Sequence, residues 1–134
     1  MGKLYNNLSP VEFKNALNRF NGSSPWQHEH KITDDLFFWL TDGCEFVRKA
    51  ANARWLFDEI LLNQPRPEIR NLRFQIWILW FEKDNDEEEG CWVLRCDDFK
   101  ENTILVQMIV DRDFPINEIT IWVIDGVAML PGEY

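Results

Sequence analysis

The chain has 134 residues, of which 46% are hydrophobic and 14% aromatic, and this is enough apolar material for the core of one domain. Its formal net charge of -9 is concentrated in residues 74–134, which carry four Lys or Arg against fourteen Asp or Glu. Such an acidic surface repels phosphate backbones, so we expect no direct nucleic-acid binding. A basic protein partner, which would give a regulatory role, or plain solubility explains the acidity better.

The sequence has no segment that predicts membrane insertion or secretion. Its uninterrupted apolar runs stay below the roughly eighteen residues of a membrane span, and MGKLYNNLSP lacks the apolar core of a signal peptide. The three cysteines show neither a CxxC pair nor zinc-ligand spacing, which favours reduced thiols. We therefore expect a cytoplasmic protein without membrane contact.

The first expected helix begins after Ser9. Ser9 suits the N-cap, Pro10 suits the first helical position, and Glu12 completes a capping box three residues after the cap. Apolar residues then recur at three- and four-residue spacing, which predicts one buried stripe. Gly22 offers the left-handed conformation that ends a helix.

A second helical region is expected after a short strand. Residues 36–41, LFFWLT, form an aromatic run typical of a buried strand, and they follow a turn-rich connection, residues 21–35, that holds a short edge strand. Asp42 is expected to cap a helical region over residues 44–62, with Asn52 as a break within it.

The remainder of the chain predicts a sheet. The segments rich in β-branched and aromatic residues are residues 74–81, 91–96, 103–110 and 119–124. Asp125-Gly126 then marks a two-residue hairpin. Links this short make successive strands antiparallel neighbours. The sequence therefore predicts one α+β domain, residues 1–134, with an antiparallel β-meander of about five strands and roughly two to three helices packed on one face.

The acidic run KDNDEEEG, residues 83–90, lies between two of these segments. Counted from Asp84, it lacks the correctly spaced glycine and the final glutamate that a helix-flanked calcium loop requires. We therefore interpret it as the solvated tip of a hairpin rather than as an ion site.

Several short motifs resemble a known family. They are RFNGSSPW (19–26), LTDG (40–43), ANARWLFDEI (51–60), FQIW (74–77), DFPINEITIWV (113–123) and LPGEY (130–134). With these motifs the chain resembles, from about Phe20 to Tyr134, an uncharacterised family of small bacterial and mobile-element proteins classified as a domain of unknown function. It departs from the family pattern at Gly132, where serine is usual, and in the helix after LTDG, which is less alanine-rich. The resemblance implies an α+β fold and a bacterial or phage setting, and it brings no catalytic residue.

His28 and His30 lie two residues apart on a predicted strand, which points both imidazoles to one face. Asp34 or Asp42 could complete a metal set, and a hydrolase would need Asp42 to converge with both histidines. However, no third or fourth ligand stands at a spacing that is diagnostic of a metal site. Two histidines exposed at the surface are the simpler interpretation. Cys44 is favoured as a buried apolar residue over a reactive thiol, since no histidine is placed by sequence to serve it. We therefore predict no cofactor, no metal and no catalytic residue.

The strand at residues 74–81 is apolar on both faces, yet the predicted helices cover only one of them. The residues that we assign to the second face are Trp77, Leu79, Arg95 and Trp122. An apolar face of this size is expected to meet another subunit, a partner or a ligand, and two-fold dimers dominate soluble assemblies. We therefore predict a non-enzymatic interaction domain that forms a homodimer through this face. The alternative is that the N-terminal segment or residues 21–35 fold over it.

A second functional hypothesis is a small-ligand protein that binds a nucleotide-like molecule. Its pocket would be lined by Trp26, Trp39, Trp55, Arg54 and His28. Indole rings stack on bases and arginines pair with phosphates, and the N-terminal half holds most of the cationic residues.

Overall fold

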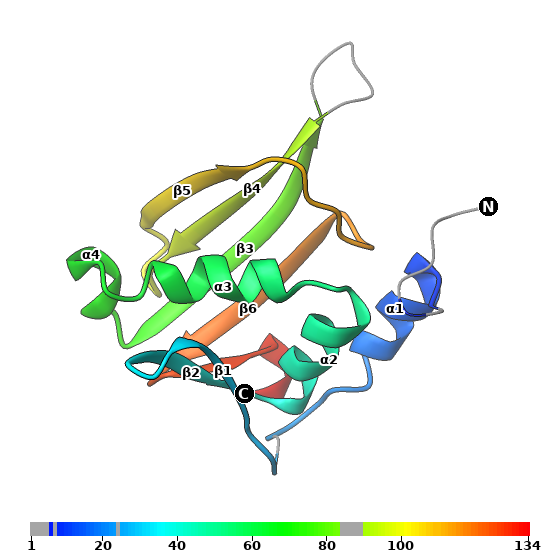
Figure 1. The fold of residues 1–134 in the computed structure, drawn as a ribbon, viewed down its shortest axis with the longest axis horizontal. Coiled ribbons are helices and arrows are strands. Elements are labelled where there is room, and N and C mark those ends of the chain that lie inside the picture. Colours follow the sequence, from blue (N-terminus) through cyan, green and yellow to red (C-terminus); the bar gives the residue numbers. More distant parts are fainter. Residues whose placement is uncertain (1–5, 7, 24, 84–89) are drawn as a thin grey trace.

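The computed structural model describes residues 6, 8–23, 25–83 and 90–134 of the chain. Within these residues a seven-stranded mixed sheet packs against helices, which confirms the α+β class (Figure 1). None of the described helices has the length and apolar composition needed to cross a membrane. The elements in chain order are α1 (Pro10–Leu17), β1 (His28–Thr33), β2 (Leu36–Leu40), α2 (Asp42–Ala50), α3 (Arg54–Leu62), α4 (Pro67–Arg70), β3 (Phe74–Lys83), β4 (Gly90–Asp97), β5 (Thr103–Ile109), β6 (Glu118–Ile124), β7 (Val127–Met129) and the 3-10 helix η1 (Pro131–Glu133).

The strand order in the sheet is β1-β2-β7-β6-β3-β4-β5. The meander β3-β4-β5 is antiparallel as predicted, but β6 pairs with the other edge of β3, and β2 pairs in parallel with β7. The predicted number of strands is therefore too low, and one pairing is not antiparallel. A parallel pair needs a long connection, and the chain from α2 to β6 supplies it.

Local signals account for the helix ends. In α1, Glu12 N–H donates to Ser9 Oγ at 3.2 Å and Ser9 N–H donates to Glu12 Oε1 at 3.0 Å, which confirms the capping box. Helix α2 is capped by Thr41, whose Oγ1 accepts a backbone N–H of the first turn at 3.4 Å. The prediction of Asp42 as the cap is wrong, because Thr41 has the extended backbone and Asp42 is already helical. Asn52, at a φ of 49°, separates α2 from α3 as predicted.

The C-terminal segment closes the start of α2 with a buried carboxylate. Glu133 Oε2 accepts from Gly43 N–H at 3.0 Å, and Glu133 Oε1 accepts from the Thr41 hydroxyl at 2.6 Å and from Leu130 N–H at 3.0 Å. A carboxylate at this place meets the positive end of the helix dipole. The LTDG and LPGEY motifs, far apart in the sequence, therefore form one structural unit.

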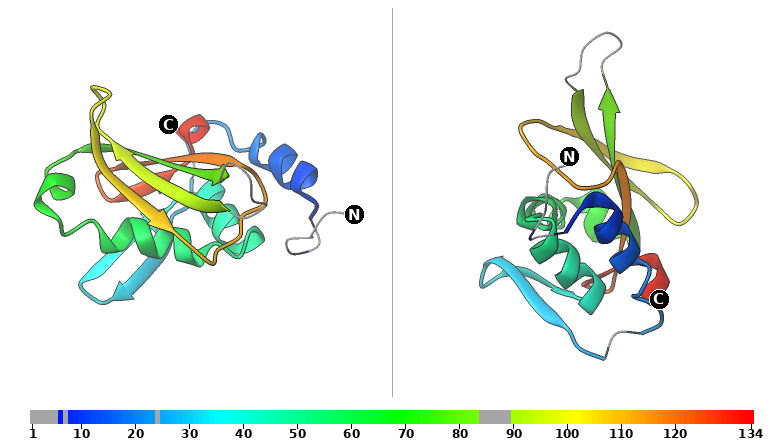
Figure 2. Two further views of the ribbon diagram at one scale, coloured as in Figure 1. Left: turned by 90° about the horizontal axis from the view of Figure 1, so that it is seen from above. Right: turned by 90° about the vertical axis from the view of Figure 1, so that its right-hand side faces the viewer.

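Helices α2 and α3 lie on one face of the sheet and leave the opposite face of β3, β4 and β5 open (Figure 2). Side chains of β3 alternate between these faces, so Trp77 and Leu79 are only 1% exposed beneath the helices. The prediction that these two residues lie on the open face is wrong. The polar residue Gln75 also stands on the covered face. It is buried because its Oε1 accepts from Trp77 Nε1 at 2.9 Å and from Gln64 Nε2 at 2.8 Å.

The strand register puts the other two assigned residues on the open face. Ile78 stands opposite Arg95 on β4, and Ile76 stands opposite Trp122 on β6. Directly opposite residues share a face, so Arg95 and Trp122 lie with Ile76 and Ile78 on the side away from the helices. The assigned set therefore divides between the two faces of the sheet.

Two further predictions concern connecting segments. Residues 21–35 contribute β1, which pairs with β2 and extends the sheet edge instead of folding over the open face. In the N-terminal segment, α1 packs on α2 through the rings of Phe13 and Phe46, 5.5 Å apart, and residues 1–5 and 7 lie outside the described part. The acidic residues 84–89 also lie outside it, although the pairing of Lys83 with Gly90 fits the hairpin interpretation.

Candidate interaction surface

The open face of the sheet is mostly apolar. We call the side chains that share this face by register the outer face: Phe74, Ile76, Ile78 and Trp80 of β3, Val93, Arg95 and Asp97 of β4, Val106 and Met108 of β5, and Glu118, Thr120, Trp122 and Ile124 of β6. Val93 is only 4% exposed, so its neighbours on this face already cover it. Near the free edge of the sheet, Val106 and Met108 are 56% and 69% exposed. A contiguous apolar surface of this kind is typical of an interaction site.

Arg95 lies in the middle of the outer face. Its guanidinium carbon is 5.3 Å from the centroid of the Trp80 ring, which is a cation–π contact. Its Nε is 3.0 Å from Asp97 Oδ1, but neither atom has a hydrogen-bond partner among the described residues, because the N–H is not directed at the oxygen. Trp and Arg are among the residues most enriched at interface hot spots. The outer face therefore has a polar anchor within apolar surroundings.

At one end the outer face leads into a concave site, which we call the aromatic hollow. It has a volume of about 450 Å³ and is lined by Arg73, Phe74, Phe99, Trp122, Ile124 and Tyr134. The Phe74 ring centroid lies 5.2 Å from Phe99, 5.1 Å from Trp122 and 6.0 Å from Tyr134. Phe99 and Tyr134 are 72% and 74% exposed, so the hollow presents aromatic surface to water.

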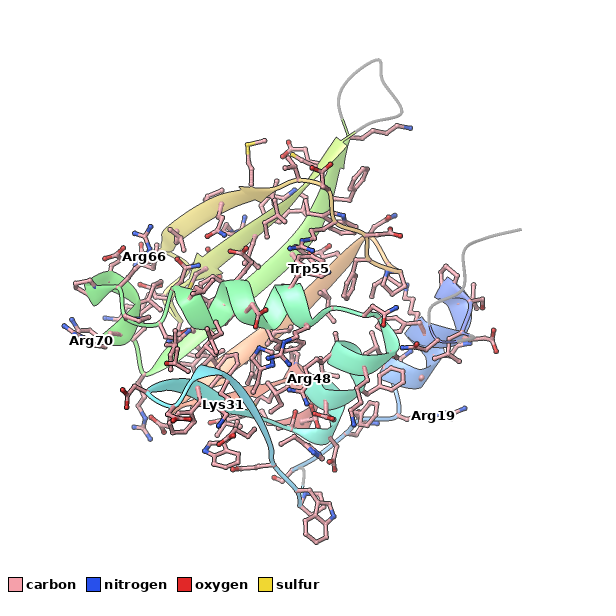
Figure 3. All side chains as sticks on the ribbon, in the orientation of Figure 1. Arg19, Lys31, Arg48, Trp55, Arg66 and Arg70 are labelled. Atoms are coloured by element: carbon pink, nitrogen blue, oxygen red, sulfur yellow. The ribbon has the colours of Figure 1, made fainter. Side chains whose placement is uncertain are left out.

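The residues of the predicted nucleotide pocket do not converge. Trp55 lies in the core beside the sheet (Figure 3), whereas Trp39 lies on the opposite side of β2 and Trp26 is exposed. The sheet therefore separates Trp39 from Trp55. Arg54 donates to a backbone carbonyl of β1, and His28 pairs with a carboxylate of α2. The prediction that these side chains line one pocket is wrong.

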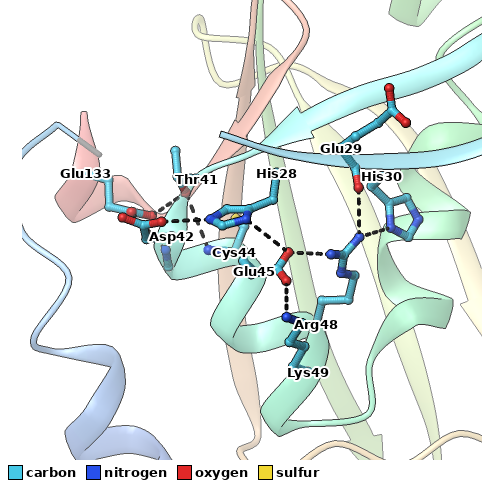
Figure 4. A network of polar contacts seen from close by, with 11 residues as sticks. His28, Glu29, His30, Thr41, Asp42, Cys44, Glu45, Arg48, Lys49 and Glu133 are labelled. Carbon is cyan, nitrogen blue, oxygen red and sulfur yellow. Dashed lines mark hydrogen bonds and ion pairs between the residues drawn. The ribbon is translucent and has the colours of Figure 1, made fainter. Parts of the chain in front are cut away.

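The two histidines pair with different carboxylates, and Figure 4 shows the pair of His28 with Asp42 and the contact of His30 with Arg48. His28 Nε2 lies 2.8 Å from Asp42 Oδ1, and His30 Nε2 lies 2.8 Å from Asp58 Oδ1. Arg48 Nη1 donates to His30 Nδ1 at 3.0 Å. These contacts tie β1 to α2 and α3, and they direct His30 away from Asp42, so the three residues of the hydrolase hypothesis do not converge. Within the described residues, no group of three or more His, Cys, Asp or Glu side chains is arranged to hold a metal.

His30 is buried in its neutral form. Because a guanidinium only donates, His30 Nδ1 accepts from Arg48 and the proton sits on Nε2, which donates to Asp58. Burial lowers the pKa of His30, and the charges of Arg48 and Arg54 lower it further, while the hydrogen bond and the charge of Asp58 oppose the shift. The imidazole therefore remains neutral to a lower pH than free histidine does.

Acidification is expected to destabilise the protein through His30. Because the folded-state pKa lies below the reference value of 6.5, the stability contribution of His30 is complete above pH 6.5. It is lost as the pH falls towards the folded-state pKa, since only the unfolded chain then binds the proton. Urea unfolding at about pH 8 and about pH 5 should show a larger loss of unfolding free energy for the wild type than for His30→Gln. Equal losses in the two proteins would contradict this role of His30.

Cys44 of α2 and Cys96 of β4 are buried thiols. Burial, followed by the charge of Glu133, raises the pKa of the Cys44 thiol well above its ordinary value. Burial also raises the pKa of Cys96 to about 12. The prediction of Cys44 as a buried residue is confirmed.

A family model matches residues 11–134, from the first turn of α1 to Tyr134. The chain belongs to DUF6876, a family of unknown function. No curated protein and no solved structure matches it. The outer face and the aromatic hollow lie entirely within the region that matches DUF6876. The bacterial or mobile-element setting of the resemblance stays a prediction.

Several residues of this DUF6876 surface are missed by sequence reasoning. The sequence could have indicated Val106 and Met108, because side chains alternate along a strand and the neighbours of these two residues face the helices. Trp80 could have been found in the same way, because it lies two residues after Ile78 on β3 and so shares its face. Phe99 and Tyr134 carry no sequence signal, since they enter the aromatic hollow only when the β4–β5 turn and the C-terminal segment approach β3.

Proposed function

We propose that this protein is a non-enzymatic interaction domain that forms a homodimer through its outer face. The observation that carries the proposal is the open apolar face of β3, β4 and β5, with Arg95 and Trp80 in its middle. Stacking two copies removes the same apolar side chains from water on both sides, and a two-fold axis makes one patch complementary to itself.

The distribution of charge supports this mode of association. Two copies with a net charge of -9 repel each other, so a stable contact needs a surface on which like charges do not meet. In the outer face, the charges of Arg95 and Asp97 lie 3.0 Å apart and offset each other. Glu118, which stands opposite Trp80, adds a carboxylate at the end of this face, whereas Asp98, Glu101, Asp111 and Asp125 belong to connections outside it. There they favour a regulatory role in which the dimer attracts a basic protein partner.

Size-exclusion chromatography with light scattering, over a series of concentrations, tests the proposal. Each chain has a mass of 16.1 kDa, and the expected result is a particle of twice that mass at micromolar concentration. The particle should dissociate on dilution and not on addition of salt, because the contact is apolar. A monomer at high micromolar concentration overturns the proposal.

A further inference from the structure

Residues 118–121 of β6 have a free edge. Strand β3 pairs with β6 along its whole length, whereas β7 pairs only with residues 122–124. Strand β7 ends at Met129, and Pro131 then begins η1, because a proline has no N–H with which to continue the ladder. Among the described strands, β3 alone therefore pairs with residues 118–121.

The backbone groups of Glu118 and Thr120 point to this free edge. Phe81 N–H donates to the Asn117 carbonyl at 3.0 Å, and bonds to the partner strand recur at every second residue of an antiparallel pair. Ile119 therefore bonds to β3, and the N–H and C=O of Glu118 and Thr120 point the other way. In the described part of the chain, no backbone group of a further segment bonds to these two residues. Unpaired N–H and C=O groups along a strand edge are a template for an added strand.

A groove runs along the free edge. Helix α1 lies beside the first half of β6 (Figure 2), and two hollows of about 750 Å³ and about 350 Å³ are lined by both elements. Because five residues line both hollows, the two form one groove, which we call the edge groove. The five shared residues are Lys14, Ile116, Glu118, Ile119 and Thr120. Val11 and Leu17 of α1 add apolar side chains to the wall that faces β6.

The edge groove is a different surface from the outer face. Of the residues that line the groove, Glu118 and Thr120 alone belong to the outer face. Hydrogen bonds between strands run in the plane of the sheet, so a strand added to β6 extends the sheet and does not cover its face. One molecule can therefore use the edge groove and the outer face at the same time.

The charge at the free edge favours a basic occupant. Glu118 is exposed, and residues 74–134 carry fourteen Asp or Glu against four Lys or Arg. A lysine or arginine that stands opposite Glu118 on an added strand forms a cross-strand ion pair. Lys14 on the α1 wall is also exposed, so its ammonium group stays in water while its methylene groups contact the occupant.

We propose that the edge groove binds an extended segment of a basic protein partner, which adds a strand to β6 in line with β7. The segment alternates apolar residues, which meet Ile119 and the wall of α1, with polar residues, one of which is a lysine or arginine opposite Glu118. Its backbone pairs with the N–H and C=O of Glu118 and Thr120. The proposal rests on the basic partner of the proposed function but not on the homodimer.

Fluorescence anisotropy with the labelled peptide KVTVKVT tests the proposal. We expect saturable binding, and EVTVEVT should bind at least about tenfold more weakly because its carboxylates meet Glu118. N-methylation of the lysines and threonines, whose N–H groups face β6, should abolish binding, whereas N-methylation of the valines should not. No saturable binding of KVTVKVT at millimolar concentration overturns the proposal, and equal affinity of the two N-methylated peptides overturns the added strand. Light scattering on the same samples records the oligomeric state, so failure of the homodimer is a separate result.

Amide hydrogen exchange measured by NMR tests the free edge itself. In the chain alone, Thr120 N–H should exchange at least about tenfold faster than Ile119 N–H, which bonds to β3, and saturating KVTVKVT should slow Thr120 to a similar degree. A Thr120 N–H that is as protected as Ile119 in the chain alone would overturn the proposal, because the edge would already be covered.

A charge reversal locates the peptide on the molecule. Glu118→Lys should weaken the binding of KVTVKVT by about fivefold or more. Glu101→Lys is the matched control, because it makes the same change of charge on the β4–β5 turn, away from the edge groove, and should change the affinity by less than about twofold. Thermal unfolding verifies that both variants are folded. Equal effects of the two variants would mean that the peptide responds only to net charge, which overturns the proposed site.

Discussion

A variant that carries both Val106→Lys and Met108→Lys is expected to be monomeric at concentrations at which the wild-type chain is a dimer. Both side chains are more than half exposed in the single chain, so the folded monomer tolerates lysine there. Between two stacked outer faces, however, the ammonium groups lose water without gaining a partner. This penalty amounts to several kcal/mol, and the dissociation constant is expected to rise at least about a hundredfold. Sedimentation velocity at matched concentrations measures the change.

The matched control for this variant is Val11→Lys. Val11 is 69% exposed, like Met108, but it lies on α1 and outside the outer face, so the control should remain a dimer. Circular dichroism and thermal unfolding establish that the double variant keeps its fold. A double variant that still forms a dimer at low micromolar concentration would mean that another surface joins the two copies.

The features predicted correctly from the sequence are those whose determinants are close together in the chain. The capping box of Ser9 and Glu12 stabilises the start of α1 with contacts three residues apart. The hairpin at Asp125-Gly126 forms because both residues adopt positive φ values, 49° and 79°, which match the twist of the paired strands β6 and β7. Neither feature requires information from elsewhere in the fold.

The strand pairings that sequence reasoning misses are non-local. Trp39 of β2 stands opposite Val127 of β7, and these residues come from opposite ends of the chain. Strand β7 has three residues, too few for a periodic pattern, and its position is fixed by the hairpin on one side and β2 on the other. The placement of β6 against β3, and not against β5, also depends on tertiary packing.

The outer face is predicted only in part, because the sequence does not show which face of β3 the helices cover. Hydrophobic alternation orients a strand only where one of its two faces is polar, and β3 is apolar on both. The polar Gln75 does not mark the open face either, because it lies on the covered face, where Gln64 and Trp77 satisfy its amide. Arg95 and Trp122 lie on the open face, but Trp77 and Leu79 do not. Knowledge of the register, rather than of composition, is needed to separate them.

The contact of the C-terminal segment with α2 is expected to be the strongest single polar contribution to stability. Glu133→Ala leaves Gly43 N–H, Leu130 N–H and the Thr41 hydroxyl without their acceptor in a buried site. The free energy of unfolding should fall by about 3 kcal/mol, because buried donors without an acceptor have given up their hydrogen bonds to water and gain none in the folded protein. Urea unfolding measures the loss, and the exposed Glu68→Ala, which removes a surface pair with Arg66, should change it by less than about 1 kcal/mol.

A double-mutant cycle separates this contact from a general loss of helix stability. A Cβ atom at Gly43 would clash with Glu133 Oε1 and would lie 2.7 Å from Leu130 Cδ1, so Gly43→Ala must displace the C-terminal segment. In the Glu133→Ala background most of that clash is absent, and the same Gly43→Ala change should cost at least about 1 kcal/mol less. Strictly additive effects would mean that Glu133 does not hold the start of α2 in solution. A coupling of this sign would establish that the LTDG and LPGEY motifs bind each other.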